Sequence, residues 1–194
     1  MRSCFKCLGL FVGWCVAMPF LCGCYMGGMV VGRSKSFTST SEWLGLIPGN
    51  FGIYTRKVCY SVLLKSVGRD VSFGFMSLFS KQQAQLGDRV YIGRFCTIGW
   101  ANIGDNVLLA DGVQVLSGGN QHRGRKGEHE PQFDMITIGD GAWIGAGAVV
   151  MADVGPGAIV GASAVVTKPI AATARVGGIP AKPLGITGDA RAFT

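Results

Sequence analysis

The segment IGDGAWIGAGAVV, residues 138–150, holds Ile138, Ile144 and Val150 six positions apart, and Gly follows the first two. The same six-residue phrase fills residues 86–120, where it slips once by one position, and it resumes over 138–167. An aliphatic residue at every sixth position, with a small residue behind it, is the hexapeptide signature of a parallel β-helix.

This spacing has a direct physical meaning. Three six-residue legs complete one triangular coil, and the aliphatic side chain of each leg points inward to stack on the coil below. The small residue behind it is expected to let the backbone turn the corner, at little steric cost where it is Gly. A dinucleotide-binding α/β fold is excluded because no amphipathic helical segment separates the short strands. The sequence therefore predicts an all-β solenoid.

These repeats resemble those of the hexapeptide-repeat acyltransferases, specifically the polysaccharide and sugar O-acetyltransferases. The resemblance covers about residues 86–184, and it includes GAWIG at 141–145, VVTKP at 165–169 and GIPAK at 178–182. It implies a left-handed parallel β-helix, which is an exception to the right-handed crossover rule. The hand comes from the family, because periodicity alone does not supply it.

Charge and cysteine content narrow the function. The chain of 194 residues has a net charge of +7, of which residues 1–70 contribute +6 and the rest only +1. No nucleic-acid motif accompanies the basic residues, so we expect no nucleic-acid partner and assign the charge to a membrane surface. Five of the seven cysteines fall in the first 24 residues, mostly within an apolar run where Cys acts as a small hydrophobe. The odd count disfavours a disulfide framework, so a reducing compartment is expected.

The N-terminal segment is predicted to associate with a membrane. No charged residue occurs between Lys6 and Arg33, a run of 26 residues that is long enough to span a hydrocarbon core of about 30 Å. Because Pro19 and six Gly weaken a regular helix, the alternatives are a true span, a broken hairpin and a segment lying in the interface. A signal peptide is disfavoured because a coenzyme A-dependent domain belongs in the cytoplasm. We expect attachment to the cytoplasmic face of the inner or plasma membrane.

The chain divides into four regions. Residues 1–40 hold the hydrophobic segment and a polar linker that begins at Arg33, and residues 41–70 hold a basic amphipathic helix over 51–66. Lys57, Ser61, Lys65 and Arg69 would form one basic stripe suited to a membrane surface. The alternative for this helix is a cap packed on the first coil. Residues 71–184 form the β-helix, interrupted by a loop at 117–137, and residues 185–194 form a tail.

The loop at 117–137 carries both histidines of the chain, His122 and His129. Solenoids commonly place such an insertion on their binding face. Acyl transfer needs a base to take the proton of the attacking hydroxyl or amine, and a neutral imidazole suits this role near neutral pH. The family resemblance implies that His122 is this catalytic base, while His129 is expected to be an ordinary loop residue. The alternatives for orienting the imidazole are Asn120, Glu128 and Asp134.

The resemblance also implies a site for acetyl-CoA along the C-terminal coils, in the groove between neighbouring subunits. Small residues there would let the pantetheine arm lie against the backbone, and lysines would meet the phosphates as point charges. The matching positions are Trp143, Ala146, Ala162, Thr167, Lys168 and Lys182. Trp143 is alternatively an aromatic residue of the subunit contact. Ile179 departs from the family, which most often has Asn at this position.

We therefore predict an acetyl-CoA-dependent O-acyltransferase that acetylates a sugar hydroxyl of a surface polysaccharide or of its lipid-linked precursor. The alternatives are acetylation of a sugar amine or another small acceptor, and a non-catalytic β-helix scaffold. A zinc-dependent carbonic anhydrase is disfavoured because two His in one loop do not supply three His ligands, so no metal is expected. Cys96 is an alternative nucleophile, although a Cys within a repeat usually packs in the core.

A homotrimer is the expected assembly. The family shares each active site between two adjacent coils, and a closed cyclic arrangement needs only one repeated interface. The resemblance therefore implies that the loop of one subunit faces the groove of its neighbour.

Overall fold

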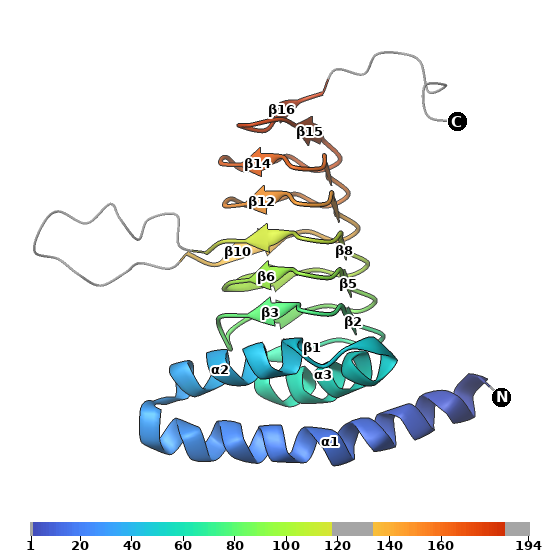
Figure 1. The fold of residues 1–194 in the computed structure, drawn as a ribbon. Coiled ribbons are helices and arrows are strands. Elements are labelled where there is room, and N and C mark those ends of the chain that lie inside the picture. Colours follow the sequence, from blue (N-terminus) through green and yellow to red (C-terminus); the bar gives the residue numbers. More distant parts are fainter. Residues whose placement is uncertain (1, 118–133, 185–194) are drawn as a thin grey trace, which may run out of the picture.

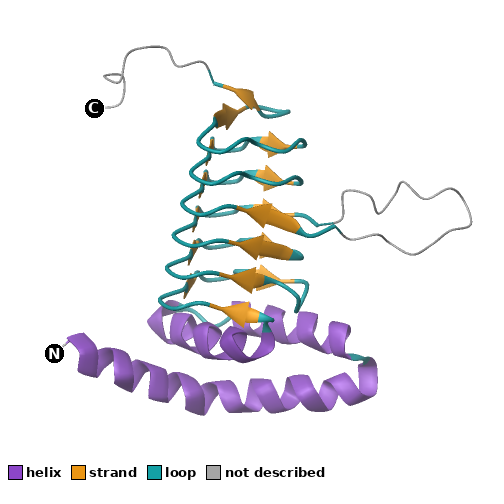
Figure 2. Cartoon of the chain, turned by 180° about the vertical axis from the view of Figure 1, so that it is seen from behind, coloured by secondary structure: helices purple, strands orange, loops and turns teal. Residues whose placement is uncertain are grey.

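The computed structural model describes residues 2–117 and 134–184, with side chains from residue 13 onward. It shows a triangular coil of short parallel strands that stands on three helices at its N-terminal end (Figures 1 and 2). The helices are α1 (Arg2–Val31), α2 (Arg33–Gly45) and α3 (Gly49–Leu63). The prediction of an all-β solenoid with an N-terminal helical extension is confirmed.

Three sheets form the faces of the coil. Sheet A contains β1 (Ser66–Val67), β4 (Gln85–Leu86), β7 (Ala101–Ile103) and β10 (Ile136–Ile138). Sheet B contains β2 (Ser72–Phe73), β5 (Tyr91–Ile92), β8 (Leu108–Leu109), β11 (Trp143–Ile144), β13 (Ile159–Val160), β15 (Arg175–Gly177) and β16 (Lys182–Pro183). Sheet C contains β3 (Leu78–Phe79), β6 (Thr97–Ile98), β9 (Gln114–Val115), β12 (Val149–Val150) and β14 (Val165–Val166). The strands of successive coils pair in parallel, and β16 turns back to run antiparallel to β15.

The coils depart from the regular repeat, in which partners on one sheet would lie roughly 18 positions apart. Tyr91 and Leu108 pair across 17 positions, and Trp143 and Ile159 pair across 16. Leu108 and Trp143 pair across 35 positions, because the predicted loop leaves the coil between β9 and β10. The one-residue shift in the repeat and the inserted loop both lie outside the strands, so the aliphatic side chains still point inward in every coil.

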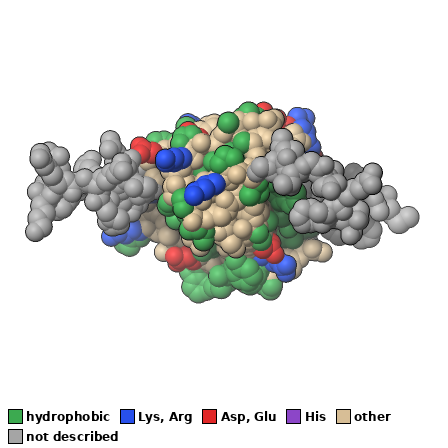
Figure 3. All heavy atoms as spheres, turned by 90° about the horizontal axis from the view of Figure 1, so that it is seen from above, with side chains coloured by type: hydrophobic (Ala, Val, Ile, Leu, Met, Phe, Trp, Pro, Cys, Tyr) green, Lys and Arg blue, Asp and Glu red, His purple; other side chains and the backbone are tan. Residues whose placement is uncertain are grey.

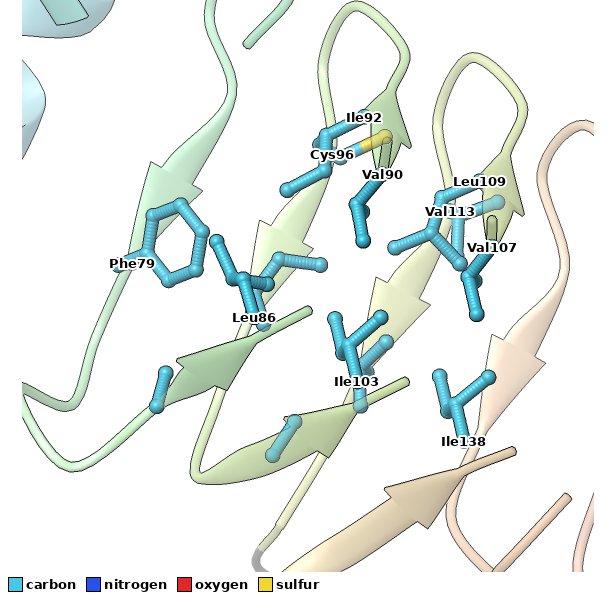
Figure 4. Close-up of a cluster of buried hydrophobic side chains, with 14 of the residues drawn as sticks. Phe79, Leu86, Val90, Ile92, Cys96, Ile103, Val107, Leu109, Val113 and Ile138 are labelled. Atoms are coloured by element: carbon cyan, nitrogen blue, oxygen red, sulfur yellow. The ribbon is translucent and has the colours of Figure 1, made fainter. Parts of the chain in front are cut away.

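The core is a stack of aliphatic side chains along the axis of the coil (Figure 4). The second residue of most two-residue strands points inward, and on sheet B Phe73, Ile92, Leu109, Ile144 and Val160 are each at most 1% exposed. Each inward side chain contributes about 1.5–3 kcal/mol relative to an exposed one. Because every inner coil covers the one below, this burial grows with each coil added.

The glycine behind each inward residue has a different role from the one expected. The left-handed backbone conformation falls two positions later, for example at Arg89 (φ 56°), and not at Gly87. A Cβ on Gly145 would lie 2.5 Å from the backbone nitrogen of Ala162 on the next coil. Glycine is therefore required because neighbouring coils approach too closely for a side chain, and a different residue makes the turn.

Carboxylates tie successive coils together where sheet A turns into sheet B. Asp88 Oδ1 accepts the backbone N–H of Arg69 at 2.8 Å, and Asp105 Oδ1 accepts that of Asp88 at 2.7 Å. Asp140 Oδ1 accepts the backbone N–H of Asp105 at 2.8 Å. Hydrogen bonds from the Arg69 side chain and backbone lower the pKa of Asp88 below its ordinary value. These contacts explain why Asp follows Gly at this place in three successive coils.

Helices α2 and α3 close the open end of the coil. Tyr60 of α3 packs against Phe73 and Phe79 of the first coil, with ring centroids 5.0 and 4.8 Å apart. Its hydroxyl lies 2.9 Å from the Ser41 hydroxyl of α2. The cap that was one of two alternatives for this region is therefore the structure that forms.

Two sequence predictions for this region are corrected by the structure. Residues 33–42, predicted as a polar linker, form most of α2, because Phe37 and Leu44 on one face of that helix are buried. The predicted basic stripe does not form, because α3 ends at Leu63, and Lys65 and Arg69 lie beyond it. The four-residue spacing of the basic side chains continues past the end of α3, where the chain enters the first coil.

Arg56 is fully buried beneath the cap, with no acidic partner among the described residues. Its Nη1 donates to the carbonyl oxygens of Leu44 at 3.0 Å and Ile47 at 2.8 Å, and its Nε donates to that of Phe73 at 3.2 Å. Leu44 and Ile47 lie at the C-terminal end of α2, where the helix dipole carries partial negative charge. Burial lowers the pKa of Arg56, while these carbonyls hold the cation and join α2 and α3 to the coil.

Helix α1 lies along the base of the molecule, beneath α2 and α3 (Figures 1 and 2). One narrow face packs inward through Ala17, Leu21 and Cys24. The outward face exposes Trp14, Met18, Tyr25, Met26, Met29 and Val30. The helix continues past Pro19, so the broken hairpin considered from the sequence does not form. Residues 13–31 are long and apolar enough to cross a membrane, a test that core helices and signal sequences also pass.

We predict that Gly145→Ala destabilises the coil by about 1–3 kcal/mol, because its Cβ meets backbone atoms that have nowhere to move. Gly161→Ala is the matched control, since its Cβ would lie 3.3 Å from the nearest atom, the Val176 carbonyl oxygen. Urea unfolding of both variants measures the difference. Equal loss of stability in the two would contradict close coil contact as the reason for these glycines.

Candidate functional site

The candidate residues lie along two corners of the coil. We call the turn from sheet B to sheet C corner BC, and the turn from sheet C to sheet A corner CA. The loop leaves the coil from corner CA after Ser117 and re-enters at Asp134, whose backbone N–H donates to the Ser117 carbonyl at 3.0 Å. The predicted base His122 lies outside the described residues, as do His129, Asn120 and Glu128.

Four of the six predicted coenzyme A residues gather at corner BC. Trp143 points outward from β11 and is 52% exposed. Ala146 and Ala162 follow on successive coils, which are joined by a hydrogen bond from the Ser163 N–H to the Ala146 carbonyl at 2.8 Å. Lys182 pairs with the end of β15 at the top of the same corner. Corner BC is therefore a column of small exposed residues with an indole at its side and a cation at its end.

The other two, Thr167 and Lys168, lie at the top of corner CA, where they follow β14. Both are exposed, and they lie on the corner from which the loop leaves two coils below. Seen down the coil axis, basic side chains lie among small and hydrophobic ones over the C-terminal end (Figure 3). The width of sheet C separates Thr167 and Lys168 from corner BC, so one chain does not bring all six residues together.

Sequence reasoning missed an apolar stripe on the outer face of sheet B. Tyr91, Leu108, Trp143 and Ile159 pair directly from strand to strand, and the first three are 39–52% exposed. Each of them directly precedes an inward aliphatic residue on the same leg of its coil. Comparing the residue before the inward aliphatic residue in every third hexapeptide would have found this stripe. An exposed strand position is ordinarily polar, and these positions are apolar.

Cys96, the alternative nucleophile, is a core residue. Its side chain is fully buried, and its thiol donates to the Ala110 carbonyl at 3.2 Å. Burial raises the pKa of the Cys96 thiol to about 11, so it stays protonated at neutral pH. Because the thiolate is the reactive form, Cys96 is unsuited to attack a thioester.

No three His, Cys, Asp or Glu side chains gather as metal ligands within residues 13–117 and 134–184. The three aspartates at the turn from sheet A to sheet B accept backbone N–H groups from the coil below. Their role in the described structure is to hold the coils in register.

The family model for the bacterial transferase hexapeptide, with six repeats, matches residues 135–168. No curated protein sequence matches the chain. Similarity is found among solved structures instead.

Galactoside acetyltransferase in complex with coenzyme A is 24% identical, with a TM-score of 0.69 over 79% of this chain and 80% of that one. A maltose O-acetyltransferase from Clostridium difficile 630 is 20% identical, with a TM-score of 0.65 over 78% and 85%. AntD, an N-acyltransferase from Bacillus cereus in complex with dTDP and coenzyme A, is 17% identical, with a TM-score of 0.54 over 62% and 72%. At these identities the matches establish the fold, and the resemblance seen in the sequence is confirmed in repeat and architecture.

Proposed function

We propose that this chain, a parallel β-helix that carries the hexapeptide repeat of bacterial transferases, transfers an acetyl group from acetyl-CoA to a hydroxyl of a saccharide. The observation that carries this proposal is corner BC. Above Trp143 its exposed residues are small over two coils, Ala146, Gly147, Ala162 and Ser163, and Ile179, Pro180 and Lys182 follow at the top. A thin pantetheine arm fits such a column, and Lys182 at its end suits a phosphate.

The chemistry needs one base and one leaving group. His122 takes the proton of the acceptor hydroxyl while the hydroxyl oxygen attacks the thioester carbonyl. The tetrahedral intermediate collapses with loss of the coenzyme A thiolate, and the imidazolium returns its proton to that sulfur. The products are an acetyl ester and free coenzyme A, and the base is restored.

We predict that His122→Ala lowers turnover by roughly 10²–10⁴, the scale of losing a general base, while acetyl-CoA still binds. His129→Ala is the control and should change turnover little. Release of coenzyme A thiol, followed against hydroxyl and amino-sugar acceptors, measures both variants and also identifies the acceptor group. Equal losses in the two variants would show that His122 is not the base.

The homotrimer is the assembly that best accommodates the site. Corner BC of one coil facing corner CA of the next would place Trp143, Ala162 and Lys182 opposite Thr167 and Lys168. The apolar stripe on sheet B, which adjoins corner BC, supports a subunit contact, because directly stacked Tyr91, Leu108 and Trp143 are unusual on a free face.

Leu108→Lys should weaken the trimer, because it places a charge at the centre of the sheet B stripe. Gln114→Lys is the matched control on the outer face of sheet C in the same coil. Light scattering of the purified chain over a range of concentrations reports the mass. A wild-type monomer, or no difference between the two variants, would exclude sheet B as the contact.

The outward face of α1 supports membrane attachment by the N-terminal end of the molecule. Only 17% of the residues in the apolar window of this helix are buried, and Glu42 is the sole acidic residue before Asp70. Exposed Arg33 and Lys35 stand at the end of the apolar run, where each would gain about 1 kcal/mol at an anionic surface. Because α1 packs along α2 and α3, a helix lying in the interface suits this structure better than the true span considered from the sequence.

Replacing Met26, Met29 and Val30 together by Glu should release the chain from anionic vesicles without unfolding it, since all three are at least 69% exposed. Leu184→Glu, at the far end of the coil, is the control and should leave binding unchanged. Vesicle flotation reports the bound fraction. This test is sharper than removing residues 1–40, which would also cut through α2, remove the buried Phe37 and uncover Leu44. Failure of the wild-type chain to float would exclude the attachment.

A further inference from the structure

The N-terminal end of the molecule, at the base of the coil, holds a cavity of about 490 Å³ between α1, the start of α2, the end of α3 and the first coil. We call it the base cavity. It is lined by Cys24, Tyr25, Gly28, Met29, Arg33, Val62, Leu63 and Gln82. Its volume falls within the 300–1,000 Å³ that is usual for small-molecule sites.

The lining is apolar except at two places. Leu63 and Cys24 form a buried wall, while Tyr25, Met29 and Val62 are exposed at the opening. The polar groups are the Gln82 amide and the Arg33 guanidinium, which makes no ion pair within the described part of the chain. An apolar cavity with one free cation is complementary to an apolar chain that ends in an anion.

The base cavity opens beneath corner CA. Gln82 follows β3, and the same corner continues upward through Trp100 after β6 to Ser117 after β9, where the loop begins. Two strand spacings separate these levels, which is about 10 Å. The cavity also adjoins the outward face of α1 at Tyr25 and Met29, the face assigned above to the membrane.

We propose that the base cavity binds the apolar chain of the lipid phosphate that carries the saccharide acceptor, with the phosphate on Arg33. The chain enters from the membrane along Met29 and Val62, and the saccharide extends up corner CA toward the root of the loop. A spacing of about 10 Å suits a phosphate-linked sugar at the lower level and its acceptor hydroxyl at the upper one. This inference rests on the proposed acetyl transfer and names the class of its acceptor.

The site is tested with the full chain in detergent, without acetyl-CoA, using a polyprenyl phosphate as the probe and native mass spectrometry as the readout. Gly28→Leu should fill the cavity, because the Cβ at this position points toward Arg33 at 3.6 Å. Gly23→Leu is the matched control on the same helix, since its Cβ would meet nothing within 4 Å. We expect binding to weaken at least about tenfold in Gly28→Leu and to stay unchanged in Gly23→Leu.

A second pair of variants tests the phosphate contact. Arg33→Gln should weaken binding of the polyprenyl phosphate but not of the uncharged polyprenol, whereas Lys35→Gln, an exposed cation outside the lining, should change neither. Phosphatidylglycerol that competes as well as the polyprenyl phosphate would overturn the proposal, because the cavity would then hold an ordinary membrane lipid. Equal binding by Gly28→Leu and Gly23→Leu would also overturn it.

Acetyl transfer to a soluble saccharide separates this inference from the proposed function. Gly28→Leu should retain that activity while losing transfer to the lipid-linked saccharide. A chain that acetylates neither acceptor would refute the proposed function, although its lipid binding would still be measured directly. If Gly28→Leu lost both activities while Gly23→Leu kept them, the base cavity would be needed for folding and not for acceptor binding, which would overturn the inference.

Discussion

The close approach of successive coils at the corners is the constraint on which the rest of this structure depends. A Cβ on Gly145 or Gly155 would meet the backbone of the next coil at 2.5 Å, so these two positions require glycine at this stacking distance. That distance brings the inward aliphatic residues into contact and allows carboxylates such as Asp105 to reach the backbone N–H of the coil below. One geometric requirement therefore links the core and the corners. The small residues on the outside of corner BC, where we propose that the acyl donor lies, are a separate feature of the upper coils.

The N-terminal end of the coil is closed by a helical cap. At the N-terminal end, α2 and α3 cover the first coil through Tyr60, Phe73 and Phe79, and the buried Arg56 joins the C-terminal end of α2 to that coil. A solenoid needs such a cap, because its last apolar layer would otherwise face water. The same cap supports α1, whose outward face is apolar. In our account the three helices therefore close the core and also bind the membrane, and they position corner CA above a lipid-linked acceptor.

The sequence was sufficient for the coil because Ile92, Ile98 and Ile144 recur with a period that only one architecture produces. It was less informative for α2, where Ser and Thr dominate the composition and only Phe37 and Leu44 mark the buried face. Arg56 was counted among the basic residues near a membrane, yet it is buried, because a tertiary contact with α2 carbonyls outweighs the charge. The candidate coenzyme A residues lie on the outside of the coil, and their division between corners BC and CA depends on which leg of the coil each one occupies. The residues around His122 lie outside the described structure, so that assignment still rests on the family resemblance.

The central claim, that corner BC of one subunit and corner CA of the next form one site, is tested most directly by mixing two inactive chains. Ala162→Trp blocks corner BC, and His122→Ala removes the base carried by the loop at corner CA, so each homotrimer should lack activity. In a random equimolar mixture about a quarter of all sites would join an intact corner BC to an intact corner CA, and acetyl transfer should return to that level. A mixture that stays as inactive as its two components, with mixed trimers verified by mass, would contradict the account.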